Sequence, residues 1–176
     1  LALHARSGIA PWAIYEFGPK TVVDYTYRGK PATHACLIAV AWSGDTQLEL
    51  IQPLTGYSIY DEHLERHGEG LHHIKLFHAD CRKVIADYAK RGYSVIQSGR
   101  FDEDEHYYLD TEKDFGYMIE LGNRGRIRAP ETANETASRR MVVEAPTIWT
   151  SAPVKPGPTT SAAEWLTRSL LLASTS

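Results

Sequence analysis

Two glutamates and one histidine, widely separated in the chain, occupy positions that otherwise predict buried strands. Glu49 lies in the run LELIQP, Glu120 lies in YMIEL, and His73 is the second histidine of GLHHI. An ionised carboxylate that faces a protein core is costly unless it is paired, protonated or bound to a metal. We therefore predict that these three side chains share one cation.

The overall composition indicates one globular domain with a substantial core, because 43% of the 176 residues are hydrophobic and 23% are charged. The formal net charge of -3 gives no basic surplus, so we expect neither a nucleic-acid partner nor an anionic membrane partner. No apolar run is long enough to span a membrane, and no secretory signal opens the chain. Cys36 and Cys81 lack metal-type spacing, which predicts buried thiols in a reducing, cytoplasmic compartment.

The predicted strands and helices that would position the three side chains follow a similar order in the two halves of the chain. The second half predicts strand, helix and three strands, at residues 71–77, 81–91, 93–97, 106–110 and 117–121. The first half predicts the end of a helix, three strands and a helix, at residues 1–6, 12–17, 34–42, 46–52 and 58–67. Residues 18–32 predict a loop or a ragged hairpin. This pattern indicates an α+β fold built from repeated βαβββ units, in which the first unit lacks its opening strand.

The composition changes near residue 126. We expect residues 1–125 to form one domain with two modules, at about 1–67 and 68–125. Residues 126–176 are rich in Pro, Ser and Thr, which predicts a linker and a C-terminal tail. A short helix at 162–172 is the main element predicted there. The tail has no assigned function.

The runs around the three polar residues resemble motifs of the vicinal oxygen chelate superfamily, over about residues 8–122. This superfamily includes glyoxalase I, methylmalonyl-CoA epimerase, extradiol dioxygenases and bleomycin-resistance proteins, and the resemblance is closest to the epimerase and glyoxalase-like branch. LELIQP is similar to its second-ligand strand, GEGLHHI to the motif whose second histidine binds the metal, and GYMIEL to its last strand. The resemblance implies a divalent metal held by Glu49, His73 and Glu120, in a cavity enclosed by two curled modules.

This resemblance also implies an activity. The chain would be a metal-dependent lyase or isomerase that acts on a small carbonyl compound or an acyl thioester. The metal would stabilise an enediolate while a proton leaves the carbon next to a carbonyl group, and Glu120 or Glu49 would be the base. Nitrogen and oxygen ligands suit Zn, Ni, Co, Mn or Fe, and the sequence does not choose among them. The superfamily further implies a homodimer.

Other side chains are candidates for contacts with the substrate. Arg28 offers bidentate recognition of a carboxylate or phosphate, although a charged turn at Tyr27 and Arg28 explains the same residues. Trp12 and His106 are two further candidates. His106 is also one of four histidines that we expect at the surface, with His63, His67 and His78, and the acidic run at residues 102–105 predicts a solvated loop.

The chain departs from the superfamily pattern at its beginning. The first metal ligand of that family lies on the opening strand of the first module, and this sequence begins after that position. The earliest histidine, His4, falls in the following helix and does not match the motif. Three explanations of the missing opening strand remain. The strand has been lost, the tail segment at 141–144 occupies its position, or another chain occupies it. An unfilled position would leave an exposed strand edge and an incomplete metal site.

Two other functions remain open, and so does a purely structural interpretation of the same residues. A ring-cleavage dioxygenase would hold iron through two histidines and a carboxylate, and a non-catalytic module would sequester a drug-like ligand. Glu49 could be an ordinary solvated glutamate on an antiparallel sheet. His73 could be a hydrogen-bonded core residue, with His72 as its neighbour.

Overall fold

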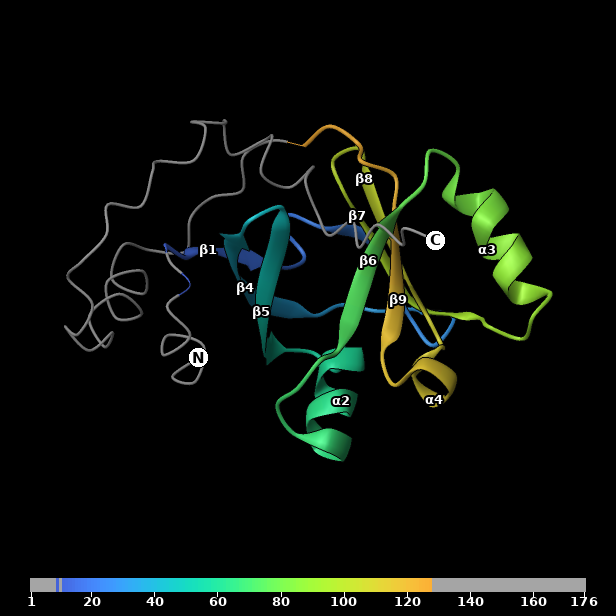
Figure 1. Ribbon diagram of the computed structural model, residues 1–176, viewed down its shortest axis with the longest axis horizontal. Coiled ribbons are helices and arrows are strands. Elements are labelled where there is room, and N and C mark those ends of the chain that lie inside the picture. The colour runs from blue at the N-terminus through green and yellow to red at the C-terminus, as the bar shows by residue number, and fades with distance from the viewer. Residues whose placement is uncertain (1–8, 10, 128–176) are drawn as a thin grey trace.

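The computed structural model describes residue 9 and residues 11–127, which form two β-sheets with short helices (Figure 1). The first sheet contains β1 (Ala13–Phe17), β4 (Ala35–Ser43) and β5 (Thr46–Thr55), in the order β1-β4-β5. The second sheet contains β3 (Lys30–Pro31), β2 (Val23–Tyr27), β7 (Val95–Phe101), β8 (Asp104–Leu109), β9 (Met118–Gly122) and β6 (His73–Phe77), in that spatial order. The helices are α2 (Ile59–His67), α3 (Cys81–Ala89) and α4 (Glu112–Phe115). This arrangement confirms the predicted α+β class.

The second half of the chain has the predicted order of strand, helix and three strands, with the short α4 inserted before the last strand. Its opening strand β6 pairs in parallel with its closing strand β9, whereas the other strand pairs are antiparallel. In the first sheet, β4 and β5 form the predicted hairpin. Among the described residues, the other edge of β5 has no strand partner. The segment at 141–144 and the predicted helices at 1–6 and 162–172 lie outside the described residues.

Strand β2 links the two halves of the chain. It pairs with the two-residue β3 and also with β7, so a strand from the first half extends the second sheet. The register of the β2–β7 pair shifts between Val23 and Thr26, and Asp24 there has a φ of 55°. Residues 18–32 therefore include a short irregular hairpin, one of the two predicted forms, but the pairing with β7 was not predicted.

Local sequence explains the two longer helices. Helix α2 begins after Ser58, whose backbone N–H and hydroxyl both donate to the Asp61 carboxylate, at 2.8 and 2.6 Å. It ends at Gly68, which has a φ of 71°. Helix α3 begins after Asp80, whose side chain accepts a hydrogen bond from the Lys83 backbone at 3.0 Å. These capping contacts explain where both helices begin.

Two apolar clusters hold the elements together. The larger cluster contains residues from both sheets and from α2, among them Phe17, Val40, Ile59, Ile96 and Met118. The smaller cluster packs α3 on the second sheet, and Figure 1 shows this helix along the outer side of that sheet. Both cysteines are free and buried, in keeping with the prediction. No helix in the described part of the chain has the length and apolarity needed to cross a membrane.

Candidate functional site

The three polar residues predicted to share a cation converge in the structure. The Nε2 atom of His73 lies 3.1 Å from Glu120 Oε2 and 3.8 Å from Glu49 Oε2. Their side chains are 10%, 4% and 21% exposed, respectively. Because Glu49 comes from β5 and the other two come from β6 and β9, this group, hereafter the central cluster, lies where the first sheet meets the second.

The parallel pairing of β6 with β9 explains the position of Glu120. Lys75 is its register partner and His73 pairs with Met118, so His73 and Lys75 lie on the same face as Glu120. The Lys75 Nζ atom is 3.0 Å from Glu120 Oε1 and 3.5 Å from Asp104 Oδ2. Each oxygen of Glu120 therefore faces one cationic side chain. Neither Lys75 nor Asp104 was predicted to be part of the site, although Lys75 follows His73 at the two-residue spacing of one strand face.

The central cluster is strongly charged. Burial disfavours the charged form of Glu120, but Lys75 and His73 outweigh burial and hold the pKa of Glu120 well below its usual range. Burial lowers the pKa of His73, but the hydrogen bonds and charges of Glu120 and Glu49 raise it overall to about 9. An imidazolium thus stands between two carboxylates, at a position where a bound cation would have the same favourable surroundings.

His72 fixes the orientation of the His73 ring. The Nδ1 atoms of the two rings are 2.9 Å apart, and burial lowers the pKa of His72 to about 3, with smaller contributions from His73 and His63. A neutral His72 can therefore accept a hydrogen bond from the Nδ1–H of His73, which directs Nε2 toward the glutamates. An outer partner of this kind is typical of metal-binding histidines.

The central cluster fits a divalent ion by its chemistry, because it offers one imidazole nitrogen and carboxylate oxygens in a mostly buried position. The candidate ligand atoms of the central cluster are less closely spaced than those of a second group. Within the described residues, His63, His67 and Glu112 are the group whose ligand atoms all lie within 4.8 Å of one another. In the central cluster, Lys75 already contacts Glu120, and Glu49 stands farther from His73.

Three of the four candidate substrate residues already have polar partners within the protein. Tyr27 and Arg28 both contact Glu62 of α2, and the Nε atom of Arg28 donates to it at 2.9 Å. The indole N–H of Trp12 donates to the Ile9 carbonyl at 2.8 Å. These contacts occupy polar groups that the sequence analysis considered for substrate binding.

His106 is half-buried rather than a surface residue, and burial lowers its pKa to about 4. Its ring lies 6.1 Å from the ring of Tyr108, which packs edge-on against His73 at 5.2 Å. The neighbouring acidic run also differs from the prediction. Residues 104 and 105 belong to β8, and the partly buried Asp104 pairs with Lys75 instead of lying in a solvated loop.

His63, His67 and Glu112 form the second group, hereafter the helix cluster. The prediction of a surface position is wrong for His63, which is 7% exposed, because α2 packs there against the unpredicted α4. His67 is at the surface as predicted, with a side chain that is 50% exposed. Glu112 was not considered, although the spacing of His63 and His67 on a predicted helix was a usable signal.

Comparison with known proteins identifies the family. The chain matches the model of the glyoxalase/bleomycin resistance protein/dioxygenase superfamily over residues 5–109, which include Glu49 and His73 but not Glu120. No relative is found among curated protein sequences.

Two solved structures are similar to parts of the chain. One is a hypothetical protein, BH1468, from Bacillus halodurans C-125, with 20% identity over 56% of this chain and 71% of that chain, and a TM-score of 0.42. The other is a Streptomyces coelicolor methylmalonyl-CoA epimerase in complex with 2-nitronate-propionyl-CoA, with 26% identity over 52% of this chain and 69% of that chain, and a TM-score of 0.36. On the strength of the family match, which spans more than half of its residues, the chain belongs to the glyoxalase/bleomycin resistance protein/dioxygenase superfamily.

Proposed function

We propose that this protein is a divalent-metal-dependent lyase or isomerase that removes a proton next to a carbonyl group. The observation that carries the proposal is the central cluster, in which His73 Nε2 lies 3.1 and 3.8 Å from two carboxylates supplied by different sheets. Membership of a superfamily that includes glyoxalases supports the same reaction class. The substrate would be a small carbonyl compound or an acyl thioester.

Glu49, His73 and Glu120 would hold the metal. A bound divalent ion supplies Lewis-acid stabilisation of negative charge on substrate oxygens. The His73 Nε2 atom would become a ligand after loss of its proton, while its Nδ1–H stays bonded to His72. In the absence of a metal, Lys75 would keep Glu120 ionised through its contact at 3.0 Å.

The two glutamates suit different roles. Glu120 faces two cationic side chains, and its lowered pKa makes it a poor proton acceptor. Glu49 is more exposed, at 21%, and its nearest ionic contact is the longer one with His73. We therefore assign proton transfer to Glu49, which would accept the proton from the carbon beside the carbonyl group and return it to the product. Glu120 would serve as the charge anchor.

The remaining expectations are part of the same proposal. The Arg28 side chain is 43% exposed, so its guanidinium could meet a substrate carboxylate or phosphate while it stays paired with Glu62. Trp12, Tyr27 and His106 remain candidate contacts. A cytoplasmic location suits the two free cysteines, and a homodimer without nucleic-acid or membrane partners stays a prediction.

Deuterium exchange and metal binding test the proposal together. The chelator-treated chain is titrated with Mn²⁺, Co²⁺, Ni²⁺ and Zn²⁺ and incubated in D₂O with a panel of carbonyl compounds and acyl thioesters. We expect metal-dependent deuterium incorporation next to the carbonyl group. Glu120→Gln should weaken metal binding, whereas Glu49→Gln should abolish exchange and weaken metal binding less. Glu16→Gln, which changes an exposed strand glutamate, is the matched control.

Three outcomes would contradict the proposal. Unchanged metal affinity in Glu120→Gln would refute the ligand assignment. Absence of metal binding in the wild-type chain would favour the ligand-sequestering module. Oxygen uptake on catechols with ferrous iron would favour the dioxygenase, which needs a second histidine ligand.

A further inference from the structure

The helix cluster has the features of a second metal site, separate from the central cluster. We propose that His63, His67 and Glu112 bind a divalent transition-metal ion, such as Zn²⁺, and leave one coordination position open. The site would connect α2 with α4. It shares no ligand with the central cluster, and its existence does not depend on the proposed function.

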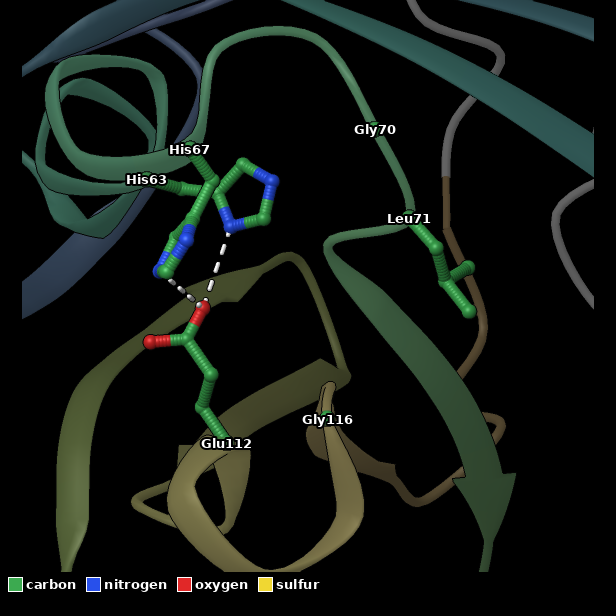
Figure 2. A pocket seen from close by; sticks show the side chains of 6 residues that line it. All are labelled: His63, His67, Gly70, Leu71, Glu112 and Gly116. Atoms are coloured by element: carbon green, nitrogen blue, oxygen red, sulfur yellow. Dashed lines mark hydrogen bonds and ion pairs between the residues drawn. The ribbon is translucent and has the colours of Figure 1, made fainter.

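The positions of the two histidines suit joint coordination. Residues four apart on a helix lie on the same face, and this spacing recurs in zinc-binding helices. The ring centroids of His63 and His67 are 5.1 Å apart. Figure 2 shows both rings directed toward Glu112, which comes from the facing helix α4.

The ligand atoms are already close to the spacing that a metal requires. Glu112 Oε1 lies 3.1 Å from His63 Nδ1 and 3.4 Å from His67 Nε2. Tetrahedral zinc with bonds of about 2.0–2.1 Å holds neighbouring ligand atoms about 3.3 Å apart. An ion could therefore enter between these atoms with little rearrangement of the side chains.

Arg66 orients the carboxylate without blocking it. Its Nη1 atom lies 3.3 Å from Glu112 Oε2, the oxygen that faces away from the histidines. Its Nη2 atom lies 2.8 Å from Glu62 Oε2, so a second carboxylate balances the guanidinium charge. Glu112 Oε1 stays directed at the two rings, as expected for a metal ligand that an outer partner positions.

A pocket of about 440 Å³ adjoins the helix cluster. It is lined by His63, His67, Gly70, Leu71, Glu112 and Gly116 (Figure 2). The Nε2 atom of His63 is buried without a hydrogen-bond partner and faces Gly70, where a Cβ atom would lie 3.8 Å from it. Buried polar atoms are normally paired, so a polar group in the pocket would satisfy this atom, while Nδ1 of the same ring is the atom that faces Glu112. The pocket has room for water or one carboxylate oxygen at the open position.

The two clusters are neighbours but remain distinct. The ring of His72 lies 5.0 Å from the ring of His63 and 5.1 Å from the ring of His73, so it separates the two groups. Zinc titration of the chelator-treated full chain by calorimetry can therefore count two sites independently. Imidazole NMR signals identify which histidines bind each ion.

His67→Ala is the informative variant, because the half-exposed His67 side chain contributes little to the core. We expect this variant to bind zinc at the helix cluster at least about tenfold more weakly, and Glu112→Gln to have a similar effect. His78→Ala, which removes a histidine outside both clusters, should bind as the wild type does. Circular dichroism of each variant verifies that the fold is retained.

The outcomes separate this proposal from the proposed function. Loss of one zinc ion in His67→Ala but not in Glu120→Gln supports the second site, even if the central cluster binds none. Zinc binding that His67→Ala and Glu112→Gln both leave unchanged would overturn the second site. If Glu120→Gln alone then loses zinc, the central metal site stands without it.

Discussion

The central cluster and the helix cluster use the same residue types but are built in different ways. The central cluster joins strands from both sheets, and the side chains of His73 on β6 and Glu120 on β9 are at most 10% exposed. The helix cluster joins two helices at one end of the molecule, with one half-exposed histidine. The first cluster contacts a buried cation, Lys75, whereas the second contacts the half-exposed Arg66. Charges in the central cluster should therefore affect folding strongly, while those in the helix cluster should mainly affect metal binding.

Glu120→Gln should produce the largest change in stability. It removes the negative charge that faces both Lys75 and His73 in a nearly dry position. Removal of one partner from a buried ion pair costs about 3–5 kcal/mol, and Lys75 and His73 would keep only their longer contacts with Asp104 and Glu49. Urea denaturation of the metal-free protein measures this loss.

A second substitution tests the cause of that loss. Adding Lys75→Met to Glu120→Gln removes the buried ammonium group that has lost its nearer carboxylate, so the double variant should recover part of the stability. Glu16→Gln on the exposed face of β1 is the control and should stay within about 0.5 kcal/mol of the wild type. If Glu120→Gln lost no more free energy of unfolding than this control, the charges of the central cluster would not stabilise the fold, and the two clusters would not differ in this respect.

Thr111→Val should have the next largest effect, because Thr111 connects the two clusters. Its fully buried hydroxyl donates to the Tyr117 carbonyl at 3.0 Å and accepts from the Ile119 N–H at 2.9 Å. It thus joins the start of α4, before Glu112, to the strand that carries Glu120. Valine keeps the shape but leaves a buried N–H unpaired, which should lower the free energy of unfolding by about 1–3 kcal/mol. Urea denaturation measures this loss. Thr111→Ser keeps the hydroxyl and should cost less, and the opposite order would mean that the methyl group matters more.

Sequence reasoning recovered the elements whose signals are local. The hairpin of β4 and β5 has Gly44 at its turn, with a φ of 60°, and the two longer helices have clear N-terminal signals. The central cluster was predictable because acids within apolar strands are unusual and because the motifs resemble a known family. The three side chains converge in the structure, and the shared metal stays a prediction.

Sequence reasoning missed features that depend on distant pairing. Strand β2 pairs with β7 about seventy positions later in the chain, as in the Tyr27–Gln97 pair, and no local pattern encodes that choice. Helix α4 has four residues, too few for helical periodicity. The burial of His63 and the role of Glu112 both follow from this unpredicted helix. The contact between Lys75 and Glu120 depends on the parallel register of β6 and β9.

Lys75→Met tests whether the buried lysine lowers the metal affinity of the central cluster relative to the helix cluster. The Lys75 ammonium competes with any cation that binds Glu120, because it lies 3.0 Å from the carboxylate. Its removal should strengthen zinc binding at the central cluster by about three- to tenfold, equivalent to about 1 kcal/mol, and leave the helix cluster unchanged. Calorimetric titration in the His67→Ala background isolates the central cluster. Weaker zinc binding in Lys75→Met would instead mean that the ammonium group positions Glu120 as a ligand.

His67→Ala should change the stability of the metal-free protein least. The His67 Nε2 atom contacts Glu112 at 3.4 Å, but water reaches half of the His67 side chain, and exposed ion pairs contribute little because solvent screens them. We therefore expect a change of less than about 0.5 kcal/mol in chelator-treated protein. Zinc should stabilise the wild type more than this variant, since an ion that binds only the folded state raises the unfolding temperature. A large loss without zinc would mean that the helix cluster, like the central cluster, holds the fold together through its own charges.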